Sequence, residues 1–225
     1  TRQLQFGDSG TFIHQSADGV LDLVSDTELE LNATTIDMNG NLDLSGTING
    51  VSILADATNF TDSILISQNA STGTLSSATD NVGIGDDVFA ALTSGRNSVA
   101  IGSNALDANT SGKNNVAVGH DALTANTTAD ENVAIGKDSL AANTTGTKNT
   151  AVGTSSLVSN TTADNNTAVG YNTASTNTTG AQLVAVGWNA LRANSTGSNN
   201  VALGKRALDA NTTASENTAV GNNSL

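Results

Sequence analysis

The chain contains little of what most folds and catalytic sites are built from. Its 225 residues include no cysteine, 3% aromatic residues, and eight lysines and arginines against 21 aspartates and glutamates. Without cysteine the chain has neither a disulfide framework nor a thiolate metal site. The net charge of −13 disfavours nucleic acid and anionic membrane surfaces as partners, because both are bound through clustered cations.

Long apolar runs are also missing. No run approaches the roughly 18 residues that cross a bilayer, so we expect no membrane insertion. The first residues, Thr1 to Leu4, do not have the character of a signal peptide, and the missing initiator methionine predicts processing or a fragment. Because the chain stops at Leu225, midway through a repeat unit, a continuation is expected.

What the chain does have is a glycine at every seventeenth position of its C-terminal two-thirds. A fixed period of this kind is typical of solenoids, in which one structural unit stacks on the next. The regular apolar register over nine periods also argues against a disordered low-complexity chain. We therefore expect residues 81–225 to form a rod of parallel coils with a 17-residue repeat, marked by Gly85, Gly102, Gly119, Gly136, Gly153, Gly170, Gly187, Gly204 and Gly221.

Each coil is expected to hold two strands. Seventeen residues at about 3.3 Å each suffice for two strands of about five residues and two turns. The glycine follows the sequence Val/Thr-Ala-Val/Ile in most units, and a leucine stands four residues after it in seven of nine. The glycine itself is expected to supply either a positive φ or a close backbone approach at the end of the strand.

The alternation along the strand indicates two faces. We assign the β-branched residues to the interior, where the leucine would pack on them from the opposite strand. The alanine would then point outward. Its small size indicates that another backbone approaches too closely there for a valine side chain to fit, and we expect that backbone to belong to a neighbouring subunit. The subunit-interface candidates are Ala100, Ala117, Ala134, Ala151, Ala168, Ala185, Ala202 and Ala219.

The N-terminal part has a different pattern. Residues 1–50 are expected to form short strands of period two, with Leu21 and Leu23 on one face and Asp22 on the other. Strands of about five residues with a single apolar face are too short for a stable monomeric sheet, so further copies of the chain would supply the missing face. Residues 51–80 are expected to connect this module to the solenoid.

The solenoid repeat resembles a known family. The Asn-Ser-Val-Ala-Ile-Gly segment at residues 97–102, with its continuation to residue 106, is similar to the head repeat of trimeric autotransporter adhesins, the YadA-like head. The resemblance implies an all-β fibrous homotrimer in which residues 81–225 form a left-handed parallel β-roll within a surface-exposed attachment rod. The familiar unit is shorter, because the Asn-Thr-Thr turn lengthens it here, so its ligands do not carry over.

The N-terminal module resembles a second group of proteins. Gly-Thr-Phe-Ile-His-Gln at residues 10–15 and the segment 36–46 are similar to tail-fibre and appendage proteins of marine-type bacteriophages. The two modules together favour a phage tail fibre located in the virion, with other tail proteins and a host-surface glycan or protein receptor as partners. The alternatives are a bacterial surface adhesin at an extracellular location and, less favoured, a polysaccharide-degrading tailspike.

Catalytic and metal-binding patterns are weak. The two histidines, His14 and His120, fall in different modules, and the repeats show no acidic cluster for catalysis on adjacent coils. Asp121 and Asp138 stack one period apart, but asparagine takes their position in other units, which favours a role in a turn. The segment 37–43 departs from a calcium loop because its glycine comes too early. We therefore expect no enzyme, no cofactor and no metal site.

Two features of the repeat suggest contacts at its outer surface. The Asn-Thr-Thr turns match the N-glycosylation pattern, although asparagine and threonine are also ordinary turn residues. The residue after each glycine varies freely, which indicates an exposed site where packing imposes no choice. Tyr171 and Trp188 occupy it in adjacent coils, about 5 Å apart, and are glycan-contact candidates. The alternatives are isolated surface aromatics or a contact between subunits.

Overall fold

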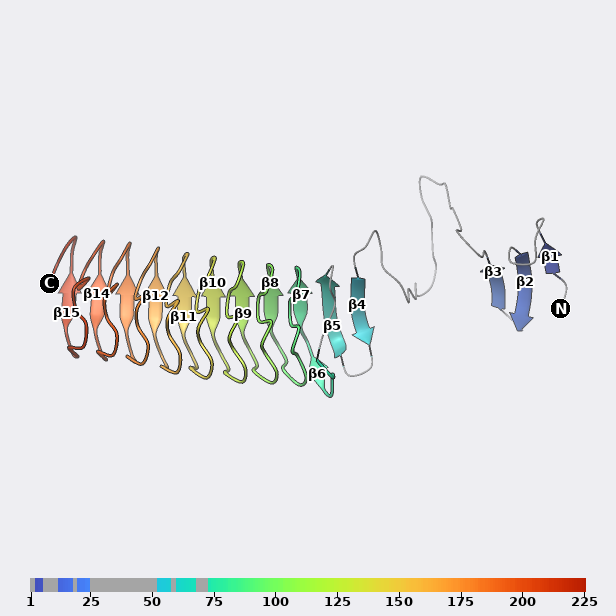
Figure 1. Cartoon of the computed structure of the whole chain (residues 1–225), viewed down its shortest axis with the longest axis horizontal. Helices are drawn as coiled ribbons and strands as arrows, with labels where there is room; N and C mark the ends of the chain where they lie inside the picture. Colours follow the sequence, from blue (N-terminus) through green and yellow to red (C-terminus); the bar gives the residue numbers. More distant parts are fainter. Residues whose placement is uncertain (1–2, 6–11, 18–19, 25–51, 58–59, 68–72) are drawn as a thin grey trace. The chain divides into compact units, whose positions relative to one another are not determined.

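The chain divides into two compact units, Thr1–Ser45 and Gly46–Leu225. The structure, a computed structural model, describes residues 3–5, 12–17, 20–24, 52–57, 60–67 and 73–225 (Figure 1). Every regular element within these ranges is a β-strand. The all-β class expected from the sequence is therefore confirmed for the described residues.

The first unit contains a small antiparallel sheet. Its strands are β1 (Gln3–Gln5), β2 (Phe12–Ala17) and β3 (Val20–Val24), paired in that order. Leu21 and Leu23 lie in β3, two residues apart on the same strand, as the period-two pattern predicted. The other short strands expected before residue 50 lie outside the described residues.

The second unit is built on one sheet of twelve strands. It starts with an antiparallel pair, β4 (Ser52–Ala57) and β5 (Phe60–Ser67). Strand β5 also pairs in parallel with β6 (Ala78–Thr79) and with β7 (Val82–Ile84). The segment that we expected to be a connector therefore supplies the first strands of the sheet. Nine parallel strands of three residues follow: β7 (Val82–Ile84), β8 (Val99–Ile101), β9 (Val116–Val118), β10 (Val133–Ile135), β11 (Thr150–Val152), β12 (Thr167–Val169), β13 (Val184–Val186), β14 (Val201–Leu203) and β15 (Thr218–Val220).

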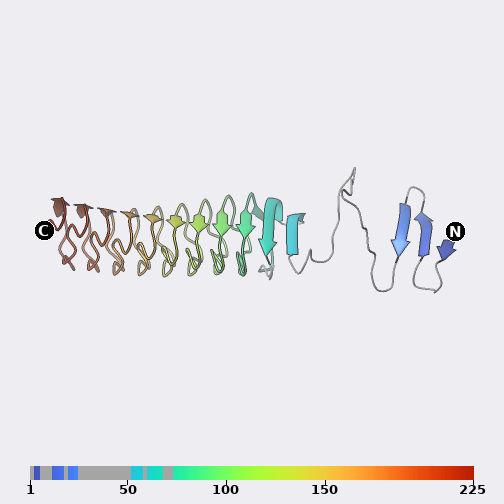
Figure 2. The same ribbon diagram turned by 90° about the horizontal axis from the view of Figure 1, so that it is seen from above.

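These strands form a β-solenoid whose repeat is 17 residues. Val116 pairs with Val133, and Val133 with Thr150, so each residue lies beside its counterpart one period away. Figure 2 shows the strands side by side in sequence order along the second unit. The fixed period predicted this parallel register, and the structure confirms it.

The number of strands per coil differs from the expectation. Each coil holds one strand of three residues, and turns make up the remainder. The reason is that three positions of most coils adopt the left-handed region, as at Asn104 (φ 57), Leu106 (φ 52) and Asn114 (φ 56). A left-handed residue reverses the direction of the chain and ends an extended segment, so the second strand cannot form.

The glycine meets both of its expected requirements. Gly102 has a φ of 125, a conformation that side-chain-bearing residues rarely adopt. A Cβ atom added to Gly102 would also lie 2.6 Å from the carbonyl carbon of Gly119 in the next coil. We call the glycines at every seventeenth position the glycine column. Because they have no side chain, the backbones of neighbouring coils can come into direct contact there.

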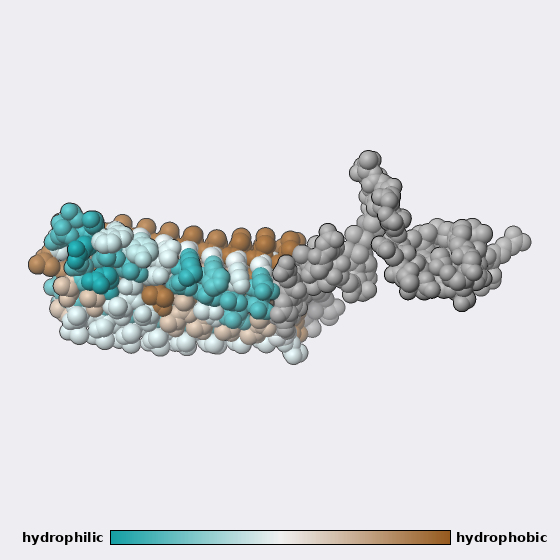
Figure 3. All heavy atoms as spheres, turned by 45° about the horizontal axis from the view of Figure 1, so that its top comes forward, coloured by the Kyte–Doolittle hydropathy of each residue, from teal (hydrophilic) through white to brown (hydrophobic). Residues whose placement is uncertain are grey.

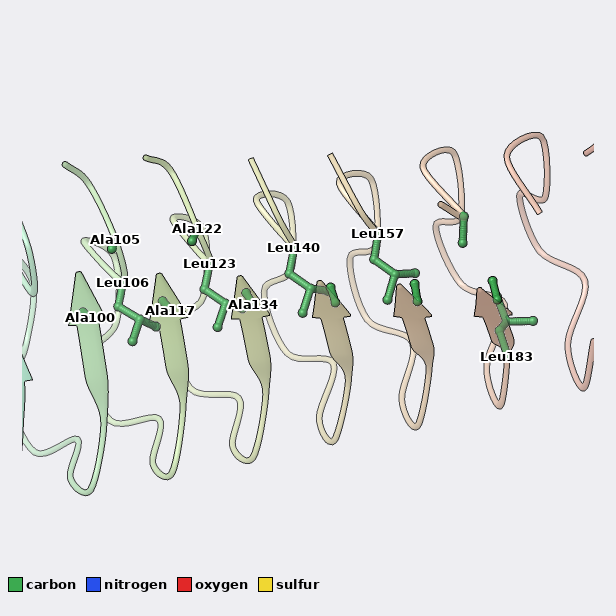
Figure 4. Close-up of a cluster of buried hydrophobic side chains, with 14 of the residues drawn as sticks. Ala100, Ala105, Leu106, Ala117, Ala122, Leu123, Ala134, Leu140, Leu157 and Leu183 are labelled. Atoms are coloured by element: carbon green, nitrogen blue, oxygen red, sulfur yellow. The ribbon is translucent and has the colours of Figure 1, made fainter. Parts of the chain in front are cut away.

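The interior is lined by the alanines and not by the β-branched residues. Ala100, Ala117 and Ala134 have no exposed area, and they share one apolar cluster with Leu123 and Leu140 from the turns (Figure 4). Our assignment of the faces was wrong, because a side chain that is buried within a single chain cannot meet another subunit. The correction applies to all eight candidates: Ala100, Ala117, Ala134, Ala151, Ala168, Ala185, Ala202 and Ala219.

The physical reason lies in what else fills the coil. Leucines from the turn and two columns of asparagine already occupy the narrow interior, which leaves room for only a methyl group opposite them. The larger β-branched neighbours of each alanine must then point the other way, because side chains alternate along a strand. Ile135, for example, is 40% exposed.

Candidate functional site

The residue that follows each glycine lies at the surface, as predicted from its variability. His120, Lys137, Tyr171, Trp188 and Lys205 are all exposed at this position. The backbone beneath them is held from coil to coil, since the Asp138 amide donates to the His120 carbonyl at 3.0 Å and the Asn189 amide to the Tyr171 carbonyl at 3.0 Å. We call these residues the variable column. It displays side chains of different chemistry at a regular spacing.

The aromatic part of the variable column is open to solvent. Tyr171 is 50% exposed and Trp188 is 44% exposed in adjacent coils. Lys205 continues the column, and its Nζ lies 5.3 Å from the centroid of the Trp188 ring, within cation–π range. Tyr171 and Trp188 thus lie exposed in adjacent coils, whereas a close approach of the two rings and a contact with a glycan stay predictions.

A second group combines His120 of the variable column with Asp121 and Asp138, the residues that follow two members of the column. The Nδ1 atom of His120 lies 2.7 Å from Asp121 Oδ2, and Asn104 Nδ2 donates to Asp121 Oδ1 at 2.8 Å. Asp138 from the next coil brings a carboxylate oxygen within 4.8 Å of the other two ligand atoms, and Lys137 pairs with that carboxylate at 3.0 Å. The group could offer three ligand atoms to a divalent cation from solution. The sequence feature that indicates this group is the separation of Asp121 and Asp138 by one period of the repeat.

The turn role that the sequence favoured for the two aspartates is confirmed. Asp121 and Asp138 both lie in the left-handed region, with φ values of 56 and 57. Asparagine and aspartate adopt this conformation more readily than other side-chain-bearing residues, which explains why asparagine replaces them in other coils. His14, the second histidine, lies in β2 of the first unit.

The asparagines of the Asn-Thr-Thr turns are buried. Asn126 Nδ2 donates to Asn109 Oδ1 at 3.1 Å, and Asn160 Nδ2 donates to Asn143 Oδ1 at 2.9 Å, so the amides form a ladder along the solenoid. A glycan cannot be attached to an amide nitrogen that is enclosed and already donating. This favours the structural interpretation of the motif over glycosylation for the buried members of the ladder: Asn109, Asn126, Asn143, Asn160, Asn177 and Asn194.

A second asparagine ladder lies four residues before the glycines. Asn132 Oδ1 accepts from the backbone amide of Asn149 at 3.0 Å, and Asn132 Nδ2 donates to the Gly146 carbonyl at 2.9 Å. Each side chain thus joins its own coil to the next one. The sequence showed the recurrence of this asparagine, but its burial was not predicted.

The outer face of the parallel sheet is apolar. The side chains that flank the buried central residue of each strand, which is Leu65 in β5, Gly83 in β7 and alanine in β8 to β15, are half-buried or exposed, and they form a continuous row along the second unit (Figure 3). We call this row the apolar sheet face. Its most exposed large members are Ile64, Val82, Ile84, Ile101, Ile135, Val184, Val186, Leu203 and Val220.

Comparisons with protein-family models, curated proteins and solved structures found no match to this chain. Within the described ranges, no helix has the length and apolar character to cross a membrane.

Proposed function

We propose that this chain is the non-catalytic shaft of a phage tail fibre, assembled as a homotrimer of left-handed β-rolls. Such a fibre would work by its reach and stiffness in host attachment. The observation that carries the proposal is the apolar sheet face, which runs along the solenoid. A soluble protein that exposes a long apolar patch usually covers it with a partner.

Further copies of the same chain fit this face best. Its members repeat with the period of the coils, so an identical rod placed alongside presents the same apolar side chains at the same spacing. The resemblance to YadA-like heads implies three chains side by side, and isoleucine and valine from three such rods can meet around a common axis. The contact is thus assigned to the β-branched residues and no longer to the alanines.

Stiffness is the property that the coil stacking supports. Each coil is joined to the next through the strand ladder, the turn amides and two columns of asparagine side chains. Bending the rod would require many of these bonds to stretch together. A rod of this kind suits a shaft that holds a receptor-binding part away from a particle.

The trimer is tested by sedimentation equilibrium of the full chain. We expect a mass of three times the 22.5 kDa of one chain. The double variant Ile101→Asp/Ile135→Asp should sediment as a single chain, since it places charges in the buried contact. The matched control Thr128→Asp/Thr145→Asp adds the same charge at exposed turn positions and should remain trimeric. A wild-type protein that sediments as one chain would contradict the proposal.

The location in a virion is tested separately. Antibodies against residues 81–225 should label the tails of phage particles in electron micrographs. Labelling of bacterial cell surfaces in uninfected cultures would instead support the adhesin alternative. Incubation of the protein with host capsular polysaccharide should release no reducing sugar, and any release would favour the tailspike alternative.

A further inference from the structure

The coils around Trp188 carry an unusual charge for this chain. Between residues 165 and 208 there is no aspartate or glutamate, whereas Arg192, Lys205 and Arg206 supply three of the eight cations in a protein of net charge −13. Arg192, Lys205 and Arg206 are all exposed. Residues 165–208 therefore carry a positive charge within an acidic chain, and Asp209, which follows them, offsets part of the charge of Arg206.

One of these cations, Lys205, lies over the exposed ring of Trp188. Tyr171, Trp188 and Lys205 occupy the variable column in three consecutive coils, and the Arg206 amide donates to the Trp188 carbonyl at 2.8 Å. Neither ring is stacked on another aromatic ring among the described residues. Two half-exposed rings and an ammonium group therefore come from the same position of three successive coils and line one strip of surface.

The residue after Trp188 differs from its equivalents in other coils by its hydrogen bonding. Asn189, which follows Trp188, has a buried Oδ1 atom without a partner in the described part of the chain. The equivalent oxygen of Asp121 is paired with Asn104. In the coil after Asn189 the equivalent residue is Arg206, whose Nε donates to Asp209 Oδ2 at 2.6 Å instead. Because the Oδ1 atom of Asn189 is enclosed, a ligand on the surface does not reach it.

We propose that Tyr171, Trp188, Lys205 and Arg206 form a binding site for an acidic saccharide, one that carries uronic acid carboxylates. The apolar C–H face of a sugar ring packs on the aromatic rings. The carboxylate pairs with Lys205 and with the guanidinium donors of Arg206 that Asp209 leaves free. Rings without cations would suit a neutral sugar, and cations without rings would suit any small anion. The inference deepens the proposed attachment function and rests on it for its biological meaning.

The chain provides its own probe for this site. Trp188 is the only tryptophan, so the intrinsic fluorescence of the full chain reports on the site directly. Titration with tetragalacturonate should change the emission in a saturable way, and maltotetraose, a neutral tetrasaccharide, should bind at least about tenfold more weakly. Equal responses to the two saccharides would overturn the proposal. An equal response to inorganic tripolyphosphate would overturn it too, because charge alone would then explain the binding.

Substitutions in the variable column distinguish a loss of saccharide binding from a loss of the fold. Lys205→Ser and Tyr171→Thr introduce residues that the column already carries at Ser103 and Thr154, so the coil should tolerate them. Each should weaken tetragalacturonate binding by about tenfold. The control Lys137→Ser removes the same charge three coils from Trp188 and should leave binding unchanged. Wild-type affinity in both site variants would contradict the assignment.

Failure of this inference is distinguishable from failure of the fibre proposal. The sedimentation mass of each variant is measured in the same preparations as the saccharide affinity. A trimer that does not bind tetragalacturonate overturns only the site. A single chain that binds tetragalacturonate with the expected selectivity overturns only the trimeric shaft and supports the site.

Discussion

The alanine at the centre of each strand determines how thin the solenoid is. Ala134 has no exposed area, and it lies in one apolar cluster with the turn leucines. Its neighbours Val133 and Ile135 point outward, so their size has little effect on the interior. One small side chain per coil therefore controls both the packing of the core and the orientation of the apolar sheet face.

Replacing this alanine should destabilise the protein from within. Ala134→Leu adds three carbons to a filled interior, and we expect the free energy of unfolding to fall by about 1–3 kcal/mol. The control Ile135→Leu alters a half-exposed residue of the same strand and should change stability far less. Urea denaturation followed by circular dichroism measures both. If both variants lost the same free energy of unfolding, the side chain of Ala134 would not be more tightly packed than that of Ile135.

The buried asparagines are the second constraint at the residue scale. Asn143 donates to Asn126 Oδ1 at 3.3 Å and to the Gly146 carbonyl at 2.9 Å, and its own Oδ1 accepts from Asn160. Asn143→Ala leaves the amide groups of its two neighbours without these partners. Unpaired buried polar groups cost about 1–3 kcal/mol each, so we expect a loss of at least about 2 kcal/mol in the free energy of unfolding.

Asn222 provides the comparison for the ladder. It is exposed in the variable column, so Asn222→Ala makes the same chemical change without enclosing an unpaired group. Its urea midpoint should match that of the wild type. If Asn143→Ala also unfolded at the wild-type urea concentration, the amide ladder would contribute nothing to stability.

At the scale of the coil, the glycine column sets how closely neighbouring turns approach. Gly136 and Gly221 share a φ of 128, so a side chain imposes the same backbone strain at both. They differ in their surroundings: a Cβ at Gly136 would lie 2.6 Å from the carbonyl carbon of Gly153, whereas at Gly221 it would meet only Ser224 at 4.0 Å. The pair therefore separates strain within a coil from contact between coils.

We expect Gly136→Ala to be much more damaging than Gly221→Ala. The strain at each position costs on the order of 1–3 kcal/mol. Only Gly136→Ala also forces two backbones apart, so its thermal unfolding midpoint should fall further than that of Gly221→Ala. Differential scanning calorimetry of both variants in the same buffer makes the comparison. Equal midpoints would mean that stacking at the glycine column is loose.

Much of the structure of the coil was predictable from the sequence, but not which side chains of the strand are buried and which are exposed. The period, the parallel register, both roles of the glycine and the exposure of the variable column follow from recurrence alone. The Val-Ala-Ile alternation defines two faces without saying which one is buried, and side-chain size favoured the wrong one. The left-handed conformation of Leu140 (φ 51) was also not predictable, because leucine rarely adopts it.

The candidate site was partly predictable for the same reason. The period placed Tyr171 and Trp188 in adjacent coils, and the same arithmetic places Lys205 in the next one. The unpaired oxygen of Asn189 and the grouping of His120 with the carboxylates depend on side-chain conformations that no period specifies. Recurrence thus predicts which residues share a column, and the structure adds how they pair.

At the scale of the whole solenoid, the coils are nearly interchangeable, because each one bonds mainly to its two neighbours. Stability in such an assembly is approximately a sum over units and their contacts. Removing one complete period should therefore shorten the solenoid without disturbing its register. Deletion of residues 137–153 joins Gly136 to Thr154, which is again a glycine followed by a variable-column residue.

The deletion of residues 137–153 should fold, with a circular dichroism spectrum like that of the wild type and a rod about 4.8 Å shorter by small-angle scattering. A deletion of residues 137–145 removes about half a period and places the strand residues of one coil against the turn of the next. Its alanines then lose their position opposite the leucines, so this shorter deletion should unfold or aggregate. If the two deletions behaved alike, the 17-residue period would not be the unit of folding, and the packing described for every coil would have to be abandoned.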